Sequence, residues 1–320
     1  MNPIVATVIG DPCGIGPEVV LKALAEAPPD VGRPLLIGSL AALEKTRAAC
    51  GIDIALRAVS DIAQARFTPG IIDVLDDFPL DPAEIVFGRA SAACGRAVLH
   101  WLASAERLGR AGAVQATVMA PVDSTALRLT GQLQDLDDLQ PPGTWLLRVS
   151  GALRVVPIAE HVLMRDVPAT VTQHNVLTLL RVLAEALERF GLARPRIAVA
   201  GLNPHAMGPE ERAELAPAIE QARAEGIDAR GPVSPDAVFR QCLEGQHDAV
   251  VSMYHDQGQI AVKTAAFKGA CSIYLGLPYV HLSIPHGSAY DIAGKGIAQH
   301  QSLLAALRTA AALAAGRGFV

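Results

Sequence analysis

Short apolar runs alternate with longer amphipathic segments along most of this chain. The apolar runs include IVATVIG, RPLLIGS, AVQATVMAP, LRVVPIAEH and RIAVAGLNPH. Segments with helical periodicity lie between them, among them GPEVVLKALAEA, LAALEKTRAAC and QHNVLTLLRVLAEALERFG. Because strands that alternate with helices pair in parallel, this pattern predicts an α/β fold with helices on both faces of a mainly parallel sheet.

The composition narrows the class of protein. The 320 residues are 51% apolar and 18% charged, which suffices for a large core in two domains or one extended domain. A net charge of -5 without a basic stripe argues against a nucleic-acid partner. The five cysteines are scattered, as is typical of reduced thiols, and we find no signal peptide or long apolar stretch. We therefore expect a cytoplasmic protein that does not enter the membrane.

Three histidines stand at the ends of three apolar runs. His161 closes LRVVPIAEH, His205 closes RIAVAGLNPH, and His255 closes DAVVSMYH before the polar turn DQG. The carboxyl ends of parallel strands share one edge of a sheet, where ligands bind, so these side chains could converge. Three imidazoles form an open site for a divalent metal, with positions left for water or substrate. The alternative is that each histidine only caps its strand or bonds a neighbouring loop.

Glycine-rich turns occur near both ends of the chain. GDPCGIGPE, residues 10–18, follows a strand and opens a helix, but it matches neither the Rossmann nor the Walker A spacing. PHGSAYDIAGKGIA, residues 285–298, exposes backbone in a small polar turn that could hold an adenosine moiety, with Asp291 accepting from ribose hydroxyls. A glycine-rich helix cap is the alternative for this loop. The stretch 133–144, which contains two adjacent prolines, is the best candidate for a linker or an exposed active-site loop.

These motifs together resemble the 4-hydroxythreonine-4-phosphate dehydrogenase family, within the isocitrate/isopropylmalate dehydrogenase-like fold. The resemblance runs nearly end to end, through GDPCGIGPE, MAPV, HVLMRDVP, GLNPHA, YHDQG, LGLP and HGSAYDIAGKGIA. It implies two α/β/α domains, a cofactor-side domain of residues 1–125 plus 276–320 and a metal, substrate and dimerisation domain of residues 126–275. It also implies a homodimer with the active site in the interdomain cleft, and NAD-dependent oxidation of a secondary alcohol, often followed by decarboxylation.

The resemblance assigns roles to particular residues. It implies that a divalent metal, zinc in the first place and magnesium, cobalt or nickel as alternatives, is held by His161, His205 and His255. Asp256 and Lys263 are the candidate catalytic residues, with Asp256 and Gln257 in the outer shell of the metal and Lys263 as substrate anchor, proton donor or simply a surface lysine. The implied NAD-binding residues are His286, Gly287, Ser288, Ala289, Asp291 and Gly294.

The chain departs from the family where the phosphorylated substrate is held. The family's Gly-His-Thr-Glu segment is replaced by residues 136–139, which include Asp137 and Asp138. Its Asn-Lys reads Asp123-Ser124, and its substrate-binding Asn and Arg fall on Ser272 and His281. Phosphate prefers arginine and other donors over carboxylates, so these changes disfavour it. We therefore expect Asp137, Asp138, Lys263, Ser272 and His281 to contact a different substrate.

The favoured substrate at this point is a cis-dihydrodiol of an aromatic carboxylate, such as terephthalate dihydrodiol, which a related branch of the family oxidises. The first alternative is 4-hydroxythreonine-4-phosphate dehydrogenation in pyridoxal phosphate biosynthesis. A second is a non-catalytic paralogue that binds a metabolite, which a failure to bind NAD would favour.

Overall fold

The chain folds into two compact units. The computed structural model describes residues 2–26, 29–134, 136–265, 271–284 and 286–320. Unit 1 comprises Met1–Pro142 and Leu277–Val320, and unit 2 comprises Gly143–Gly276. The first boundary lies at residue 142 rather than at the predicted 125, because the short helix α4 (Ser124–Arg128) packs against α3 (Ala92–Arg110) in unit 1. It falls inside the stretch 133–144 that the sequence marked as a candidate linker.

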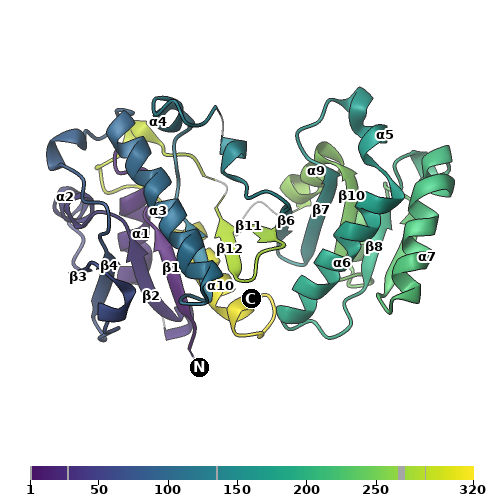
Figure 1. The fold of residues 1–320 in the computed structure, drawn as a ribbon, viewed down its shortest axis with the longest axis horizontal. Coiled ribbons are helices and arrows are strands. Elements are labelled where there is room, and N and C mark those ends of the chain that lie inside the picture. The colour runs from purple at the N-terminus through teal and green to yellow at the C-terminus, as the bar shows by residue number, and fades with distance from the viewer. Residues whose placement is uncertain (1, 27–28, 135, 266–270, 285) are drawn as a thin grey trace. The chain divides into compact units, whose positions relative to one another are not determined.

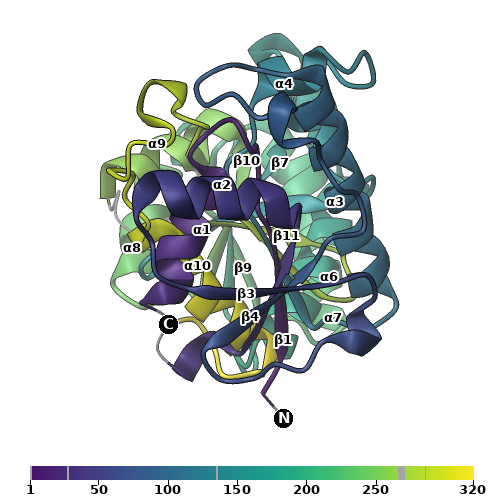
Figure 2. The same ribbon diagram turned by 90° about the vertical axis from the view of Figure 1, so that its left-hand side faces the viewer.

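The six strands that the structure describes in unit 1 all pair in parallel. In sheet order the strands are β3 (Ala55–Val59), β4 (Ile71–Leu75), β2 (Arg33–Ile37), β1 (Ile4–Val8), β5 (Ala116–Met119) and β12 (Val280–Ser283). Helices α1 (Gly16–Ala25), α2 (Leu40–Cys50) and α10 (Gln301–Ala314) lie to one side of the strands, and α3 lies on the other (Figure 2). Both faces of the central strand β1 are therefore covered, which explains its almost continuous apolar sequence.

The six strands that the structure describes in unit 2 run in mixed directions. In sheet order its strands are β11 (Cys271–Leu275), β6 (Trp145–Ser150), β7 (Leu153–Ala159), β10 (Ala249–Tyr254), β8 (Ile197–Ala200) and β9 (Ala229–Val233). The pairs β11–β6 and β6–β7 are antiparallel, and the strands from β7 to β9 are parallel. The prediction of an α/β fold with a mainly parallel sheet is confirmed.

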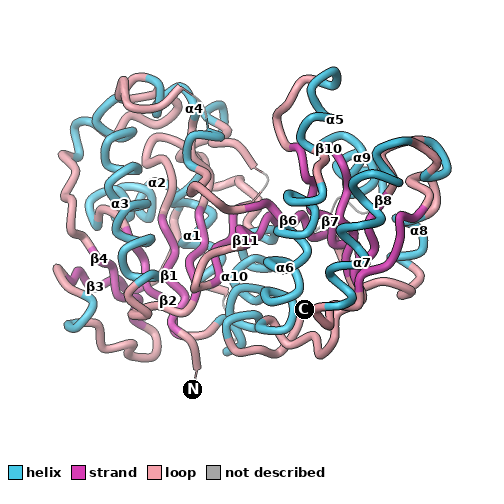
Figure 3. The backbone as a smooth tube through the Cα atoms, turned by 45° about the vertical axis from the view of Figure 1, so that its right-hand side comes forward, coloured by secondary structure: helices cyan, strands magenta, loops and turns pink. Residues whose placement is uncertain are grey.

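Helices cover both faces of the strands of unit 2. Helix α6 (Gln173–Arg189) packs side by side with α7 (Ala216–Ala224) on one face (Figures 1 and 3). On the other face, α8 (Val238–Leu243) and α9 (His255–Ala265) pack on β7, β8 and β10. That face buries a cluster made of Leu153, Val155, Ala198, Ala200, Val238, Cys242, Val250 and Val262. No helix among the described residues is long and apolar enough to cross a membrane.

The end of β10 differs from the sequence prediction. The residues after Tyr254 were expected to form a polar turn, but α9 begins at His255 without an intervening loop. Gly258 permits this tight connection, because a Cβ atom there would lie 2.8 Å from both the Ser252 hydroxyl and the Val155 side chain. His255 therefore occupies the first turn of a helix that packs directly on the sheet.

His281 lies in β12 and faces Thr117 of β5. The two residues are register partners, and His281 Nδ1 lies 2.6 Å from Thr117 Oγ1. Desolvation of the ring lowers the pKa of His281 to about 4. The histidine is therefore neutral in the folded chain at neutral pH, and it offers no positive charge.

This pKa predicts a pH dependence of stability. In the unfolded chain the histidine titrates near pH 6.5, so it takes up a proton before the folded chain does and stability falls as the pH drops from about 6.5 to about 4. We expect His281 to account for a loss of about 2 kcal/mol in the free energy of unfolding between pH 7.5 and pH 5. In urea unfolding, His281→Gln should not show this part of the pH-dependent loss in the free energy of unfolding. His174→Gln, at an exposed position of α6, should show the same loss as the unmodified chain. Equal pH dependence in all three proteins would contradict the assignment.

Candidate functional site

The three strands that carry the predicted metal ligands are parallel neighbours. β10 lies between β7 and β8 and pairs with both. His161 follows β7 by two residues, His255 follows β10 directly, and His205 lies in the 3-10 turn Pro204–Ala206 after β8. The expectation that these strand ends share one edge of the sheet is confirmed.

Two of the three histidines meet at this edge. The ring centroids of His161 and His255 are 5.2 Å apart, with the planes tilted by 48°. The Glu160 carboxylate completes a group in which one ligand atom of each residue lies within 4.8 Å of the others. Two imidazoles and a carboxylate are a donor set suited to a divalent transition metal. We refer to Glu160, His161 and His255 as the edge cluster.

His205 lies on the same edge but outside the edge cluster. Its backbone is in the left-handed region, with φ 56° and ψ 18°, and its side chain is exposed. Asn203, which directly precedes the turn, holds it in place. Its backbone N–H and its side-chain amide both donate hydrogen bonds to Glu211, at 2.7 and 2.8 Å. The structure thus brings together two of the predicted ligands and adds Glu160, which sequence reasoning missed although it directly precedes His161.

Asp256 fixes the orientation of His255. Its carboxylate oxygen lies 2.6 Å from His255 Nδ1, which leaves Nε2 as the ring nitrogen for another partner. A carboxylate on the far nitrogen is the usual way in which proteins orient a metal-binding imidazole. Asp256 therefore acts through His255, and its predicted role as an outer partner agrees with this contact better than a direct catalytic role does.

Gln257 ties two strand ends together instead of contacting His255. Its side-chain oxygen accepts a hydrogen bond from Met253 N in β10 at 2.7 Å, and its amide nitrogen donates to Gly201 O after β8 at 2.9 Å. Lys263 lies farther along α9, about 12 Å of helical rise from His255, and is exposed. Its predicted roles as proton donor or substrate anchor remain predictions.

The side chain of Arg148, in β6, lies beside the edge cluster. The Arg148 guanidinium lies 3.5 Å from a carboxylate oxygen of Glu160, and both side chains are largely enclosed, with 15% and 18% of their surface exposed. Arg148 is also the register partner of Ser272 in β11, one of the predicted substrate residues. Sequence reasoning missed Arg148 because it lies in a strand that the apolar pattern did not identify.

The predicted cofactor loop, residues 286–294, belongs to unit 1 and is held by the first glycine-rich turn. Ile15 N donates to Ser288 O at 2.9 Å, and a Cβ atom on Gly14 would lie only 2.7 Å from that carbonyl. The Tyr290 hydroxyl donates to Asp11 at 2.5 Å. These contacts explain why residues 10–18 and 285–298 are both rich in small residues.

The loop presents groups that a dinucleotide could use. His286, Gly287 and Asp291 are exposed, and a Cβ atom on Gly287 would meet open space. Ser288 is buried, and its hydroxyl has no hydrogen-bond partner among the described residues. Ala289 adopts the left-handed conformation, with φ 41°, which is uncommon for a residue other than glycine. Gly294 packs closely on Phe87, because a Cβ atom there would lie 2.4 Å from the ring, and its role in cofactor binding stays a prediction.

The two acidic residues predicted to face the substrate lie in an exposed turn. Asp137 and Asp138 are exposed in a 3-10 turn, and Asp138 accepts a hydrogen bond from Gln134 N at 2.7 Å. Ser272 is half-buried in β11 of unit 2, whereas His281 belongs to unit 1. Exposed carboxylates are screened by solvent and salt, so their electrostatic effect on a distant group is small. The argument that these residues repel a phosphate is therefore weak.

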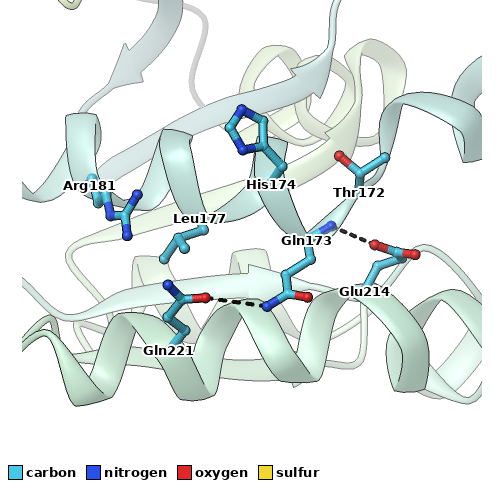
Figure 4. Close-up of a pocket in the computed structure, with 7 residues that line it drawn as sticks. All are labelled: Thr172, Gln173, His174, Leu177, Arg181, Glu214 and Gln221. Atoms are coloured by element: carbon cyan, nitrogen blue, oxygen red, sulfur yellow. Dashed lines mark hydrogen bonds between the residues drawn. The ribbon is translucent and has the colours of Figure 1, made fainter.

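A surface pocket of about 480 Å³ also lies in unit 2, between α6 and α7 (Figure 4). Gln173 spans it through hydrogen bonds with Glu214 and Gln221, at 2.6 and 3.3 Å. Much of the polar lining is hydrogen-bonded within the pocket, and none of the predicted site residues lines it. We therefore do not assign the reaction to this pocket.

Comparison with known proteins identifies the family. The model of the pyridoxal phosphate biosynthetic protein PdxA family matches residues 30–310. A Novosphingobium aromaticivorans protein named as a 4-hydroxythreonine-4-phosphate dehydrogenase is 44% identical over 320 residues, which cover 100% of this chain and 97% of the relative. The D-threonate 4-phosphate dehydrogenase of Salmonella typhimurium is 39% identical, with 97% and 98% covered.

Comparison with solved structures points to the same family. A structure from Salmonella typhimurium, named as a 4-hydroxythreonine-4-phosphate dehydrogenase, is 39% identical and aligns over 97% of this chain and 99% of that one, with a TM-score of 0.88. A terephthalate 1,2-cis-dihydrodiol dehydrogenase from Burkholderia xenovorans LB400 is 30% identical over 97% and 98%, with a TM-score of 0.73. The preference for the dihydrodiol branch is thus corrected, because the relatives named for phosphorylated substrates are more similar in sequence and structure. The chain belongs to the PdxA family of dehydrogenases.

Proposed function

We propose that this protein is an NAD(P)- and metal-dependent dehydrogenase that oxidises the 3-hydroxyl of a four-carbon hydroxy acid carrying a 4-phosphate. The observation that carries the proposal is the end-to-end similarity to the D-threonate 4-phosphate dehydrogenase of Salmonella typhimurium. D-threonate 4-phosphate and 4-hydroxythreonine 4-phosphate share the reacting hydroxyl, the carboxylate and the phosphate, and they differ at carbon 2. Both are candidates.

The edge cluster fits a metal ion. His161 and His255 would hold it, with Glu160 beside them, and His205 is the further ligand that the family resemblance predicts. Dehydrogenases of this family depend on a metal and on NAD(P). When bound, a divalent cation would polarise the substrate hydroxyl and favour loss of its proton. The contact between Asp256 and His255 Nδ1 orients the imidazole so that Nε2 is available to the metal.

The reaction releases a hydride from carbon 3 and a proton from the hydroxyl, which leaves a 3-keto acid. Such an acid can lose carbon dioxide, after which the remaining enolate takes up a proton. Lys263 is our candidate donor of that proton, as the family resemblance implies. The hydride would pass to a nicotinamide cofactor at the loop 286–294. The exposed Gly287 and the Ser288 hydroxyl, which has no partner in the described part of the chain, support binding there.

Arg148 supplies the positive charge that the sequence analysis found missing. The family's arginine position holds His281, which is neutral at pH 7, but Arg148 reaches the neighbourhood of the edge cluster from β6. A guanidinium binds phosphate or carboxylate through two parallel hydrogen bonds. We infer that Arg148 binds an anionic group of the substrate.

The first test is an assay of cofactor reduction with each candidate substrate. Purified protein is mixed with NAD or NADP and with zinc, magnesium, cobalt or nickel, and each phosphorylated acid is offered separately while absorbance at the reduced nicotinamide is followed. We expect turnover of at least one phosphorylated acid and none of its dephosphorylated form. Activity with the dephosphorylated acid alone would contradict the proposal, as would NAD(P) binding without turnover of either phosphorylated acid.

Metal affinity tests the edge cluster independently of activity. His255→Ala should lower the affinity for the metal more than Asp256→Asn, for which we expect a loss of about 10-fold to 100-fold, because a ligand contributes more than its outer partner. Equilibrium dialysis followed by elemental analysis measures both, and His174→Ala is the matched control at an exposed histidine. Comparing Glu160→Gln with His205→Ala then shows which residue supplies the remaining ligand. Unchanged affinity in His255→Ala would refute the metal site.

Arg148→Gln tests anion recognition. Losing a charge-assisted hydrogen-bond donor should raise KM for the phosphorylated substrate by about 10-fold to 100-fold, since such bonds contribute about 1.5–3 kcal/mol. Metal content should stay the same in this variant. Arg165→Gln removes a similar charge at an exposed position that follows the same edge and should leave KM unchanged. Equal KM values in both variants would show that Arg148 does not bind substrate.

A further inference from the structure

Two fully buried cysteines touch in unit 1, outside the edge cluster. Cys13 lies in the first glycine-rich turn after β1, and Cys94 lies in the first turn of α3, whose N-cap is Ser91. Both side chains are 0% exposed, and their sulfur atoms are 3.4 Å apart. We propose that Cys13 and Cys94 form a redox-active pair that closes reversibly into a disulfide.

The geometry needs little change for this reaction. A disulfide bond is about 2.05 Å long, so the sulfur atoms must approach by about 1.4 Å. Cys13 lies in a turn and Cys94 at a helix start, where side-chain rotation and a small backbone shift can supply that movement. The two residues are 81 positions apart in the chain, so the bond would link separate elements of unit 1.

The pair is also chemically polarised. The hydrogen bond with Cys94 lowers the pKa of Cys13, while the same contact, together with burial, raises the pKa of Cys94. A thiolate is the reactive form of cysteine, so Cys13 is the nucleophile and Cys94 the resolving thiol. Cys50 and Cys271 contrast with Cys13, because burial raises the pKa of each, to about 11 and about 12.

Hydrogen peroxide is the oxidant class that suits a buried pair, because it is small and uncharged. The Cys13 thiolate attacks one peroxide oxygen and breaks the O–O bond, which gives a sulfenic acid and hydroxide. The Cys94 sulfur then displaces the sulfenic oxygen as a second hydroxide, and each hydroxide takes up one proton from the original thiols to form water. The net change is two thiols plus hydrogen peroxide to one disulfide plus two waters.

A disulfide between Cys13 and Cys94 would affect the cofactor loop, because Cys13 lies in the turn that holds this loop. This effect on NAD binding rests on the proposed function. The turn that carries Cys13 binds residues 286–294 through Ile15 N and through Asp11, which accepts from Tyr290. Cys13 O also accepts from Gly88 N at 2.8 Å. Drawing Cys13 toward Cys94 pulls on these contacts, so we expect oxidation to change the dissociation constant for NAD by about fivefold or more.

The test begins with thiol chemistry and does not depend on activity. Reduced protein is treated with hydrogen peroxide, unfolded in iodoacetamide, digested and analysed by mass spectrometry. We expect free thiols to fall from five to three per chain, with a peptide that links Cys13 to Cys94 and disappears on treatment with dithiothreitol. Cys94→Ser should not form the link, whereas Cys242→Ser, a change at another buried cysteine, should form it as the unmodified chain does.

The thiol measurements and the NAD titration are independent, so the disulfide can fail while the proposed function holds, and the reverse. Absence of the linked peptide from the unmodified chain would overturn the pair, whatever the NAD titration shows. Zinc that purifies with the protein and leaves when these two thiols are alkylated would also overturn it, because Asp11 lies close enough to complete a metal site. A linked peptide with unchanged NAD affinity would support the disulfide and overturn its coupling to the loop.

Discussion

The parallel pairing of β10 with β7 on one side and β8 on the other is the constraint on which the candidate site depends. Hydrogen bonding between parallel strands sets their carboxyl ends at one edge. It does so here for register partners 95 residues apart in β10 and β7 and 52 residues apart in β10 and β8. Gln257 reinforces this alignment, because one side chain bonds the backbone of β10 and the backbone after β8. Without this pairing, His161 and His255 would have no reason to meet.

A comparable set of contacts fixes the loop in unit 1. Glu18 is buried in α1, accepts a hydrogen bond from Ala298 N at 2.8 Å, and pairs with Lys22. Lys22 in turn donates to the carbonyls of Gly296 and Ala298. The loop 286–298 is thus bonded to the first glycine-rich turn near its start and to α1 at its end. A loop held at both ends can expose backbone groups to a ligand with little loss of conformational entropy on binding.

The charges around the edge cluster differ from those that position-by-position matching to the family predicts. The family resemblance aligns Asp137 and Asp138 with residues that hold phosphate, yet both lie in an exposed turn, where Asp138 accepts a hydrogen bond from Gln134 N. His281, which the family resemblance aligns with an arginine, is neutral at pH 7. Arg148 lies in a strand where the motif comparison does not look, and it reaches Glu160 at the edge cluster. Charge at a site depends on which side chains reach it, and several elements can supply the same charge.

The sequence by itself determined the strand–helix alternation, the strands that end in His161 and His255, and the two glycine-rich turns, because hydrophobic periodicity and backbone freedom are local properties. It also determined the family through motifs spread over the chain. Only the tertiary structure decided that α9 begins at His255, that Glu160 and Arg148 join this edge while His205 stays outside the edge cluster, and that Cys13 touches Cys94. Those features follow from strand order, register and close packing between distant segments, which residue patterns within a short window do not specify.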